Sequence, residues 1–238
     1  MREIIGINNR DYQAYRKAYM KGGHNGAYYY AKEIEENIIP IVNTDYNWDL
    51  LGMRLTWHME HSLIFIHHCI NMDTVYSWLK KYHDVILIVS QQHVFDWAVD
   101  QGYMAVLLPL SIDVNYVERF KRKKKFGACY AGNRWPFKRK DEEKIPNGVD
   151  FPPNNIARED LLRFIAPYKQ CYAIGRCAIE AKTLGCEILP FYWRYPDPSH
   201  WKVLDNEDAA KMLQKALDMI KQDKHSVNCF DFPEYKAL

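Results

Sequence analysis

An arginine and a glutamate stand four residues apart in the stretch GRCAIEAKTLGCEILPF, residues 175–191. On a helix that begins near Arg176, directly after Gly175, this spacing places both side chains on the same side. The unpaired backbone N–H groups at such a helix start, together with the Arg176 guanidinium, suit the oxygens of a phosphate. The Glu180 carboxylate can accept hydrogen bonds from the two hydroxyls of a ribose. The stretch therefore predicts a site for a nucleoside diphosphate, and the alternative is an ion pair on a solvated helix face.

A second group of cations follows a glycine in the segment YAGNRWPFKRK, residues 130–140. A glycine at the end of a strand lets a ligand approach the backbone closely, and neighbouring cations can clamp a diphosphate. We interpret the segment as part of the same site, with a basic surface loop as the alternative. The residues concerned are Gly132, Asn133, Arg134, Lys138 and Arg139.

Three side chains in the first half of the chain are candidates for a general base, which accepts a proton from an attacking hydroxyl. His24 lies in the glycine-rich stretch MKGGHNGAYYYAKEI, His67 ends the apolar run LIFIHH, and Asp45 follows the apolar run IIPIVN. The alternatives are a flexible turn at His24 and a hydrogen-bonded structural histidine at His67. The sequence HMEH, residues 58–61, has a spacing close to that of metal ligands, but it lacks a third ligand, so we do not predict a zinc site.

The elements that would position these residues are short apolar strands alternating with helices. The strands show no alternation of polar and apolar residues, which is typical of a parallel sheet covered on both faces. In the first half we predict strands at 38–43, 63–68, 85–90 and 105–110 and helices at 73–82 and 91–102. In the second half we predict strands at 128–133, 148–151, 171–175 and 187–191 and helices at 157–168, from 176, and at 206–222. The pattern predicts two α/β units that meet near 112–127.

A basic segment, ERFKRKKKF at 118–126, lies where the two units meet. It has no pattern typical of a core, and we predict a solvated linker. The alternative is a phosphate-binding patch for nucleic acid or another anionic surface.

Three stretches resemble the glycosyltransferases of the GT-B fold, which consist of two facing Rossmann-like domains. They are the stretch 171–191, the stretch LPLSIDVNYVERF at 108–120, and the stretch YAGNRW at 130–135. The resemblance implies two parallel-sheet lobes facing a cleft, with an acceptor-side lobe at 1–115 and a nucleotide-sugar-binding lobe at 116–238. It covers roughly residues 60–220.

Carried over residue by residue, the resemblance makes Glu180 the group that holds the ribose of the donor. It places Gly132, Arg134 and either Lys138 or Arg139 at the diphosphate, and Gly175 and Arg176 beside the phosphates. Tyr172 occupies the position where many retaining members carry a glutamate, and it is counted with the donor-binding residues. The sequence lacks an Asp-x-Asp pair, in agreement with a metal-independent mechanism in which cations and helix ends offset the charge of the leaving diphosphate.

The expected activity is transfer of a sugar from a nucleoside-diphosphate donor, such as a UDP-sugar, to a hydroxyl acceptor on a glycan, a small molecule or a modified DNA base. The nucleotide sugar is a co-substrate, and no further cofactor or metal is expected. A non-catalytic nucleotide-binding protein is the alternative of a different class. The formal net charge is +2, the six cysteines form no CxxC pair, the start of the chain is unlike a signal peptide, and no run of about 18 apolar residues is present. These features predict a cytoplasmic protein with free thiols.

Overall fold

The computed structural model describes residues 2–7, 9–10, 13, 26–50, 58–66, 77–123, 126–131, 145–153, 156–191 and 197–238. The chain divides into two compact units, Met1–Pro109 with Asn206–Leu238, and Leu110–Asp205. The expected lobes, 1–115 and 116–238, differ from these units chiefly in where they place the carboxyl-terminal segment. That segment joins the first unit because its strand β9 (Val227–Asn228) pairs in parallel with β5 (Met104–Leu107).

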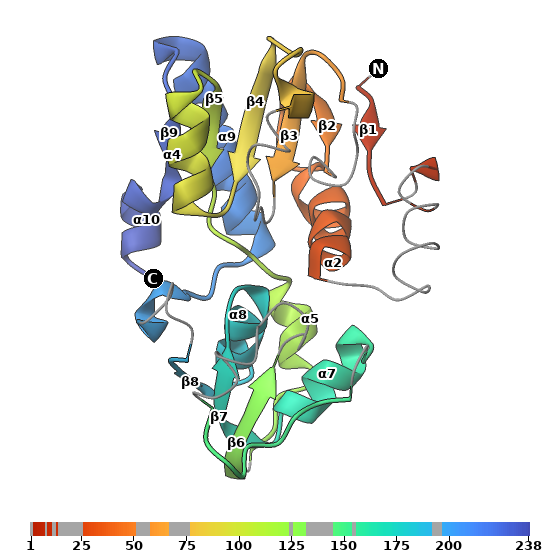
Figure 1. Ribbon diagram of the computed structural model, residues 1–238, viewed down its shortest axis with the longest axis vertical. Helices are drawn as coiled ribbons and strands as arrows, with labels where there is room; N and C mark the ends of the chain where they lie inside the picture. The colour runs from red at the N-terminus through yellow and green to blue at the C-terminus, as the bar shows by residue number, and fades with distance from the viewer. Residues whose placement is uncertain are drawn as a thin grey trace. The chain divides into compact units, whose positions relative to one another are not determined.

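The first unit is built on a parallel sheet in the order β1-β2-β3-β4-β5-β9 (Figure 1). Its central strands are buried at every position, because both faces of the sheet are covered. The predicted strands at 63–68, 85–90 and 105–110 are confirmed at 63–66, 85–89 and 105–107; residues 90 and 108–110 are not part of a strand, and 67–68 lie outside the described residues. The remaining strands are β1 (Ile4–Ile5), β2 (Asn47–Asp49), β3 (Ser62–Ile66) and β4 (Val85–Val89).

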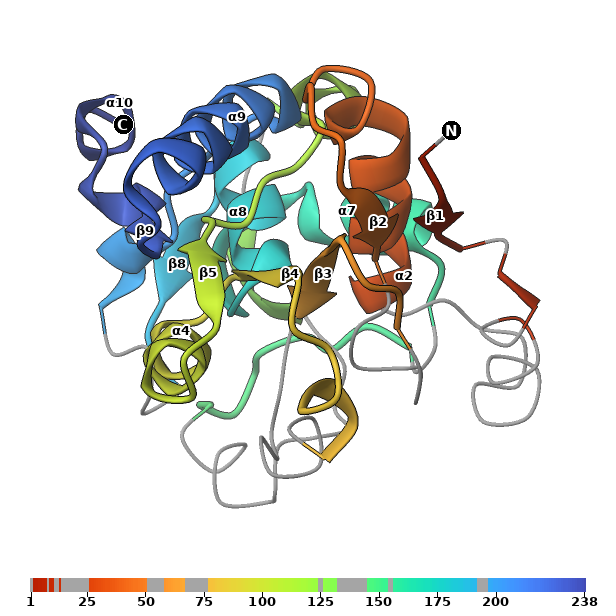
Figure 2. The same cartoon turned by 90° about the horizontal axis from the view of Figure 1, so that it is seen from above.

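Helices cover the two faces of this sheet, with α2 and α9 on one face and α4 on the other (Figure 2). The predicted helix at 91–102 is confirmed as α4 (Gln92–Asp100), and Gly102 follows its end with a φ of +81°. The predicted helix at 206–222 is confirmed as α9 (Asn206–Asp223), which buries its apolar stripe. Of the helix predicted at 73–82, the described residues 77–79 are helical and 73–76 lie outside the described part. The other elements are α2 (Gly26–Glu33), η1 (Ile34–Ile38), η3 (Cys229–Asp231) and α10 (Pro233–Lys236).

The predicted strand at 38–43 is wrong. The chain instead forms the π-helix η1, which ends at Ile38, and then a turn over 39–41. Ile34 and Ile38 are both buried, so the apolar spacing at this point is that of a helix. Pro40 lacks the N–H that a central strand would have to donate. Asp45 therefore precedes a strand, β2, instead of following one.

The second unit contains a three-stranded parallel sheet in the order β6-β7-β8. The predicted strands at 128–133, 171–175 and 187–191 correspond to β6 (Phe126–Ala131), β7 (Tyr168–Ala173) and β8 (Glu187–Leu189). The strand predicted at 148–151 is reduced to a single bridge between Asp150 and Cys129. The helices are α5 (Val114–Glu118), α7 (Arg158–Ile165), α8 (Arg176–Thr183) and η2 (Pro198–His200).

Successive residues of β7 contribute to two different apolar clusters in this unit. Cys171 and Ala173 belong to the cluster that includes the buried side chains of α7 and α8. Tyr172, which lies between them, packs with Tyr130 and Phe191. Because side chains alternate across a strand, Tyr172 points to the face opposite the one that α8 covers.

The five cysteines in the described part of the chain are free thiols, four of them buried, as predicted. No helix within the described ranges has both the length and the apolar character that crossing a membrane requires.

Candidate functional site

The turn between β7 and α8 places a helix start at the carboxyl end of a parallel strand, where open α/β sheets bind ligands. Gly175 directly precedes α8 and has a φ of +60° and a ψ of −139°, a conformation that is essentially restricted to glycine. Among the described residues, a Cβ at this position would come within 4 Å only of the Leu110 Cδ1 atom, at 4.0 Å, so backbone conformation and not space requires the glycine there. Gly175 has no side chain to cap α8, and the N–H groups at its start can face an anion.

Arg176 and Glu180 face each other on the first turns of α8, as their spacing predicted. The Arg176 Nε atom donates a hydrogen bond to Glu180 Oε1 at 3.1 Å. Arg176 is 7% exposed and Glu180 is 2% exposed. The ion pair of the alternative interpretation is therefore present, but its placement on a solvated helix face is wrong, since both charged groups are buried.

A third charged residue, Arg158, belongs to this cluster and was missed in the sequence. It is the first residue of α7, and its Nε atom donates to the same Glu180 Oε1 atom at 3.0 Å. Its guanidinium also lies over the Tyr116 ring, 5.1 Å from the centroid. An arginine in the first turn of a helix is disfavoured by the helix dipole. This unfavourable position was the available signal that Arg158 has a specific partner.

Two guanidinium groups and one carboxylate give these three residues, the Arg–Glu–Arg cluster, a net charge of +1 beside the positive end of α8. The cluster thus places buried positive charge at the positive end of a helix, and the two together favour an anion. Glu180 holds both arginines through one oxygen atom, so its main role in the described geometry is to orient them. Burial and the Glu180 carboxylate raise the pKa of the neighbouring Cys177 thiol to about 12.

The other residues expected at the donor site are divided between the described and the undescribed parts of the chain. Tyr172 is described, but it lies on the opposite face of the sheet from α8. The expected diphosphate loop, which comprises Gly132, Asn133, Arg134, Lys138 and Arg139, lies outside the described residues, as do His24 and His67.

Asp45, the third candidate for a base, lies before β2 at the amino end of the sheet. Its carboxylate is exposed and pairs with Lys221 Nζ at 3.4 Å and with His61 Nε2 at 3.4 Å. A backbone hydrogen bond, with the Lys221 charge adding to it, lowers the pKa of Asp45. A lowered pKa makes this carboxylate a weaker base, and its edge of the sheet is not the one where ligands bind.

A buried aspartate–histidine pair in the first unit was also missed. The His58 Nδ1 atom lies 2.5 Å from Asp49 Oδ2, and both side chains are fully buried. The His58 backbone N–H donates to the Tyr82 hydroxyl at 2.7 Å. The Nε2 atom of His58 is buried and has no hydrogen-bond partner within the part of the chain that the structure describes. To act as a base, His58 Nε2 would have to contact the hydroxyl of an acceptor, and its burial prevents that contact. We therefore interpret the Asp49–His58 pair as a structural bond that joins β2 to the segment before β3.

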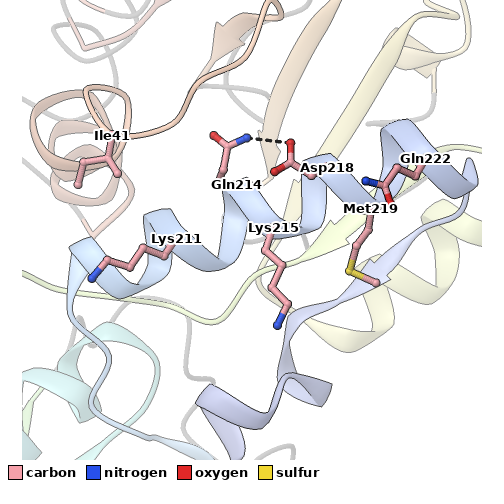
Figure 3. A pocket seen from close by; sticks show the side chains of 7 residues that line it. All are labelled: Ile41, Lys211, Gln214, Lys215, Asp218, Met219 and Gln222. Carbon is pink, nitrogen blue, oxygen red and sulfur yellow. Dashed lines mark hydrogen bonds between the residues drawn. The ribbon is translucent and has the colours of Figure 1, made fainter.

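A pocket of about 470 Å³ lies along the outer side of α9 (Figure 3). Several of its polar side chains bond to neighbours: Gln214 donates to Asp218 at 3.0 Å, and Lys215 pairs with Glu234 at 2.8 Å. The Gln214 Oε1 atom accepts from the Asn43 backbone N–H at 2.6 Å. None of the residues predicted from the sequence lines this pocket, and its side chains provide no grouped charge of one sign.

Comparison of the chain with protein-family models finds no match, and searches of curated proteins and of solved structures find none either.

Proposed function

We propose that the protein transfers a sugar from a nucleoside-diphosphate donor to a hydroxyl acceptor. The observation that carries the proposal is the buried Arg–Glu–Arg cluster at the start of α8. It concentrates positive charge where a parallel strand ends and a helix begins, which is the placement that a diphosphate requires. The proposed reaction, sugar transfer, comes from the resemblance of the stretch 171–191 to the GT-B glycosyltransferases.

In this proposal the diphosphate lies against the first N–H groups of α8, and the guanidinium groups of Arg158 and Arg176 offset the charge that develops as it leaves. Stabilisation of a leaving group by preorganised donors in a water-poor site is a large catalytic effect. Each of the two units is built on a parallel sheet, as the resemblance implies for each lobe. Glu180 positions the arginines, which revises its expected role as the direct partner of the ribose.

The alternative is a protein that binds a nucleotide without transferring its sugar. This alternative is favoured because neither candidate base that the structure describes in the first unit is placed to contact an acceptor. Asp45 is exposed at the amino end of the sheet, and the Asp49–His58 pair is closed to solvent. Sugar transfer with inversion needs a base that can contact the acceptor.

A screen of nucleotide sugars by thermal shift, followed by a transfer assay, tests the proposal. A ligand at about 100 times its dissociation constant should raise the Tm by about 5 to 10 °C. Arg176→Lys keeps the charge but removes the two-pronged donor, so it should reduce this shift. Arg163→Lys is the matched control, because Arg163 is exposed on α7 and pairs with Glu159 and Asp160.

Three outcomes are distinguishable. A shift with release of nucleotide in the presence of acceptors supports the transferase. A shift without any release supports the binding protein. No shift with any nucleotide sugar, or equal shifts in the Arg176→Lys variant and the wild type, would refute the assignment of the site.

A further inference from the structure

A second concentration of positive charge in the unit Leu110–Asp205 lies between α5 and β6, and it meets the Arg–Glu–Arg cluster at Tyr116, whose ring contacts both Arg119 and Arg158. We define the basic–aromatic segment as residues 119–123 together with Phe126, the first residue of β6. Strand β6 is an outer strand of the three-stranded sheet (Figure 1). Asp150 pairs with this strand at Cys129, so the segment borders the exposed start of β6, at Phe126 and Gly127, before that pairing begins.

Four cations of this segment are exposed: Arg119, Lys121, Arg122 and Lys123. Lys121 Nζ pairs with Glu118 Oε1 at 3.3 Å, but both side chains are about half exposed, so this pair is weak. Within the described ranges, Arg122 and Lys123 form no ion pair. Residues 119–126 contain no acid. Like charges gathered without balancing acids repel each other, and a polyanion relieves that repulsion.

An aromatic ring borders these cations. Phe126 is 60% exposed, whereas most large apolar side chains of its unit are buried. Its ring lies 5.1 Å from the Tyr168 ring, and the Tyr168 hydroxyl donates to Asp150 Oδ2 at 2.7 Å. The ring of Phe126 thus rests on a buried, hydrogen-bonded neighbour and presents its other side to solvent.

We propose that the basic–aromatic segment binds single-stranded nucleic acid. The cations contact successive phosphates of the strand, and Phe126 stacks on one of its bases. Charged side chains that follow the backbone beside an aromatic platform for a base are the combination that such binding requires. This inference goes beyond the proposed sugar transfer and does not depend on it.

A lipid surface is the competing polyanion, and the structure favours nucleic acid over it. Stable membrane attachment takes an apolar anchor in addition to a basic patch. Among the described residues of this unit, Phe126 is the single large apolar side chain that is exposed. One ring held at the start of a β-strand suits stacking on a base better than insertion between lipid chains.

Fluorescence anisotropy with a labelled oligo(dT) of about 20 nucleotides, longer than common site sizes, tests the proposal in the whole chain of 238 residues. Arg122→Glu with Lys123→Glu should weaken binding more than about 10-fold near 100 mM salt and lower the salt slope by about 1.4, since each phosphate contact contributes about 0.7. The matched control is Lys80→Glu with Lys224→Glu, which makes the same charge change at exposed positions in the other unit.

Phe126→Leu keeps an apolar side chain but removes the stacking surface, and it should weaken binding by about 5- to 100-fold. Phe126→Trp should retain it. The proposal is overturned if the wild type does not bind the oligonucleotide, if the control variant loses as much affinity as the Arg122/Lys123 variant, or if Phe126→Leu binds like the wild type. Binding to vesicles of phosphatidylglycerol and phosphatidylcholine without binding to the oligonucleotide would identify a lipid surface instead.

Discussion

Replacement of Glu180 by alanine tests the Arg–Glu–Arg cluster most directly. Glu180 Oε1 is the shared acceptor for Arg158 Nε at 3.0 Å and Arg176 Nε at 3.1 Å. The side chains of the two arginines are only 12% and 6% exposed. Glu180→Ala therefore leaves two buried cations side by side without the carboxylate that holds them.

The expected cost is about 3 to 5 kcal/mol, because removal of one partner from a buried ion pair leaves an uncompensated charge. Against a typical total of about 5 to 15 kcal/mol, this loss is a large fraction of the free energy of unfolding. Arg158→Ala should cost less, about 1.5 to 3 kcal/mol, since it leaves a neutral Arg176–Glu180 pair and removes one charged hydrogen bond. Adding Arg158→Ala to Glu180→Ala should recover part of the loss, because one buried cation remains instead of two.

Urea denaturation of the wild type, the two single variants and the double variant measures these free energies and completes a double-mutant cycle. Glu159→Ala is the matched control. It removes a glutamate from an exposed pair with Arg163, where the side chains are 54% and 53% exposed, and it should cost less than about 1 kcal/mol.

A loss below about 1 kcal/mol for Glu180→Ala, equal to that of the control, would refute the conclusion that this carboxylate holds two buried arginines. A double variant less stable than the Glu180 variant by the full cost of Arg158→Ala would show that the two residues act independently. Nucleotide-binding titrations of Glu180 variants must therefore be read together with their stability.

Three further predictions follow from other residues of the chain. Gly175→Ala forces a side chain into a conformation with φ of +60°, and urea denaturation should show a loss of about 1 to 3 kcal/mol; an unchanged midpoint would mean that the turn can relax. Burial and the Glu180 carboxylate raise the pKa of the Cys177 thiol to about 12, so this thiol should react with iodoacetamide at pH 8 far more slowly in the folded protein than in urea. In the folded state, Cys177 should react faster in the Glu180→Ala variant than in the wild type. Leu217 on α9 is 2% exposed, and Leu217→Ala should destabilise the first unit by about 2 to 5 kcal/mol. An isolated fragment 110–205, which does not contain α9, should still fold, as its circular dichroism spectrum would show.

Strands with strong local signals were predictable from the sequence. The runs at 63–66 and 85–89 are uninterrupted apolar stretches, and both became fully buried central strands. The run at 38–43 has a similar composition, yet it follows a helix and contains Pro40. Composition alone does not separate a buried strand from the end of a buried helix, because both need the same apolar side chains.

The pairing of Arg176 with Glu180 was predictable because it depends on helix geometry within a single turn. The participation of Arg158 was not, since 22 positions separate it from Glu180 and only the packing of α7 near α8 brings the two together. The placement of α9 and β9 in the first unit likewise depends on a pairing with β5 that is distant in the chain.

The sequence by itself determined the α/β class, most of the strands and helices, and the local Arg176–Glu180 pair. These features depend on neighbouring residues, whose propensities and spacing act over a few ångströms along the chain. Only the tertiary structure decided that this pair is buried, that a second arginine shares its carboxylate, and that Asp45 precedes its strand. Burial and charge pairing depend on which distant segments exclude water from a group, and spacing along the chain does not encode that.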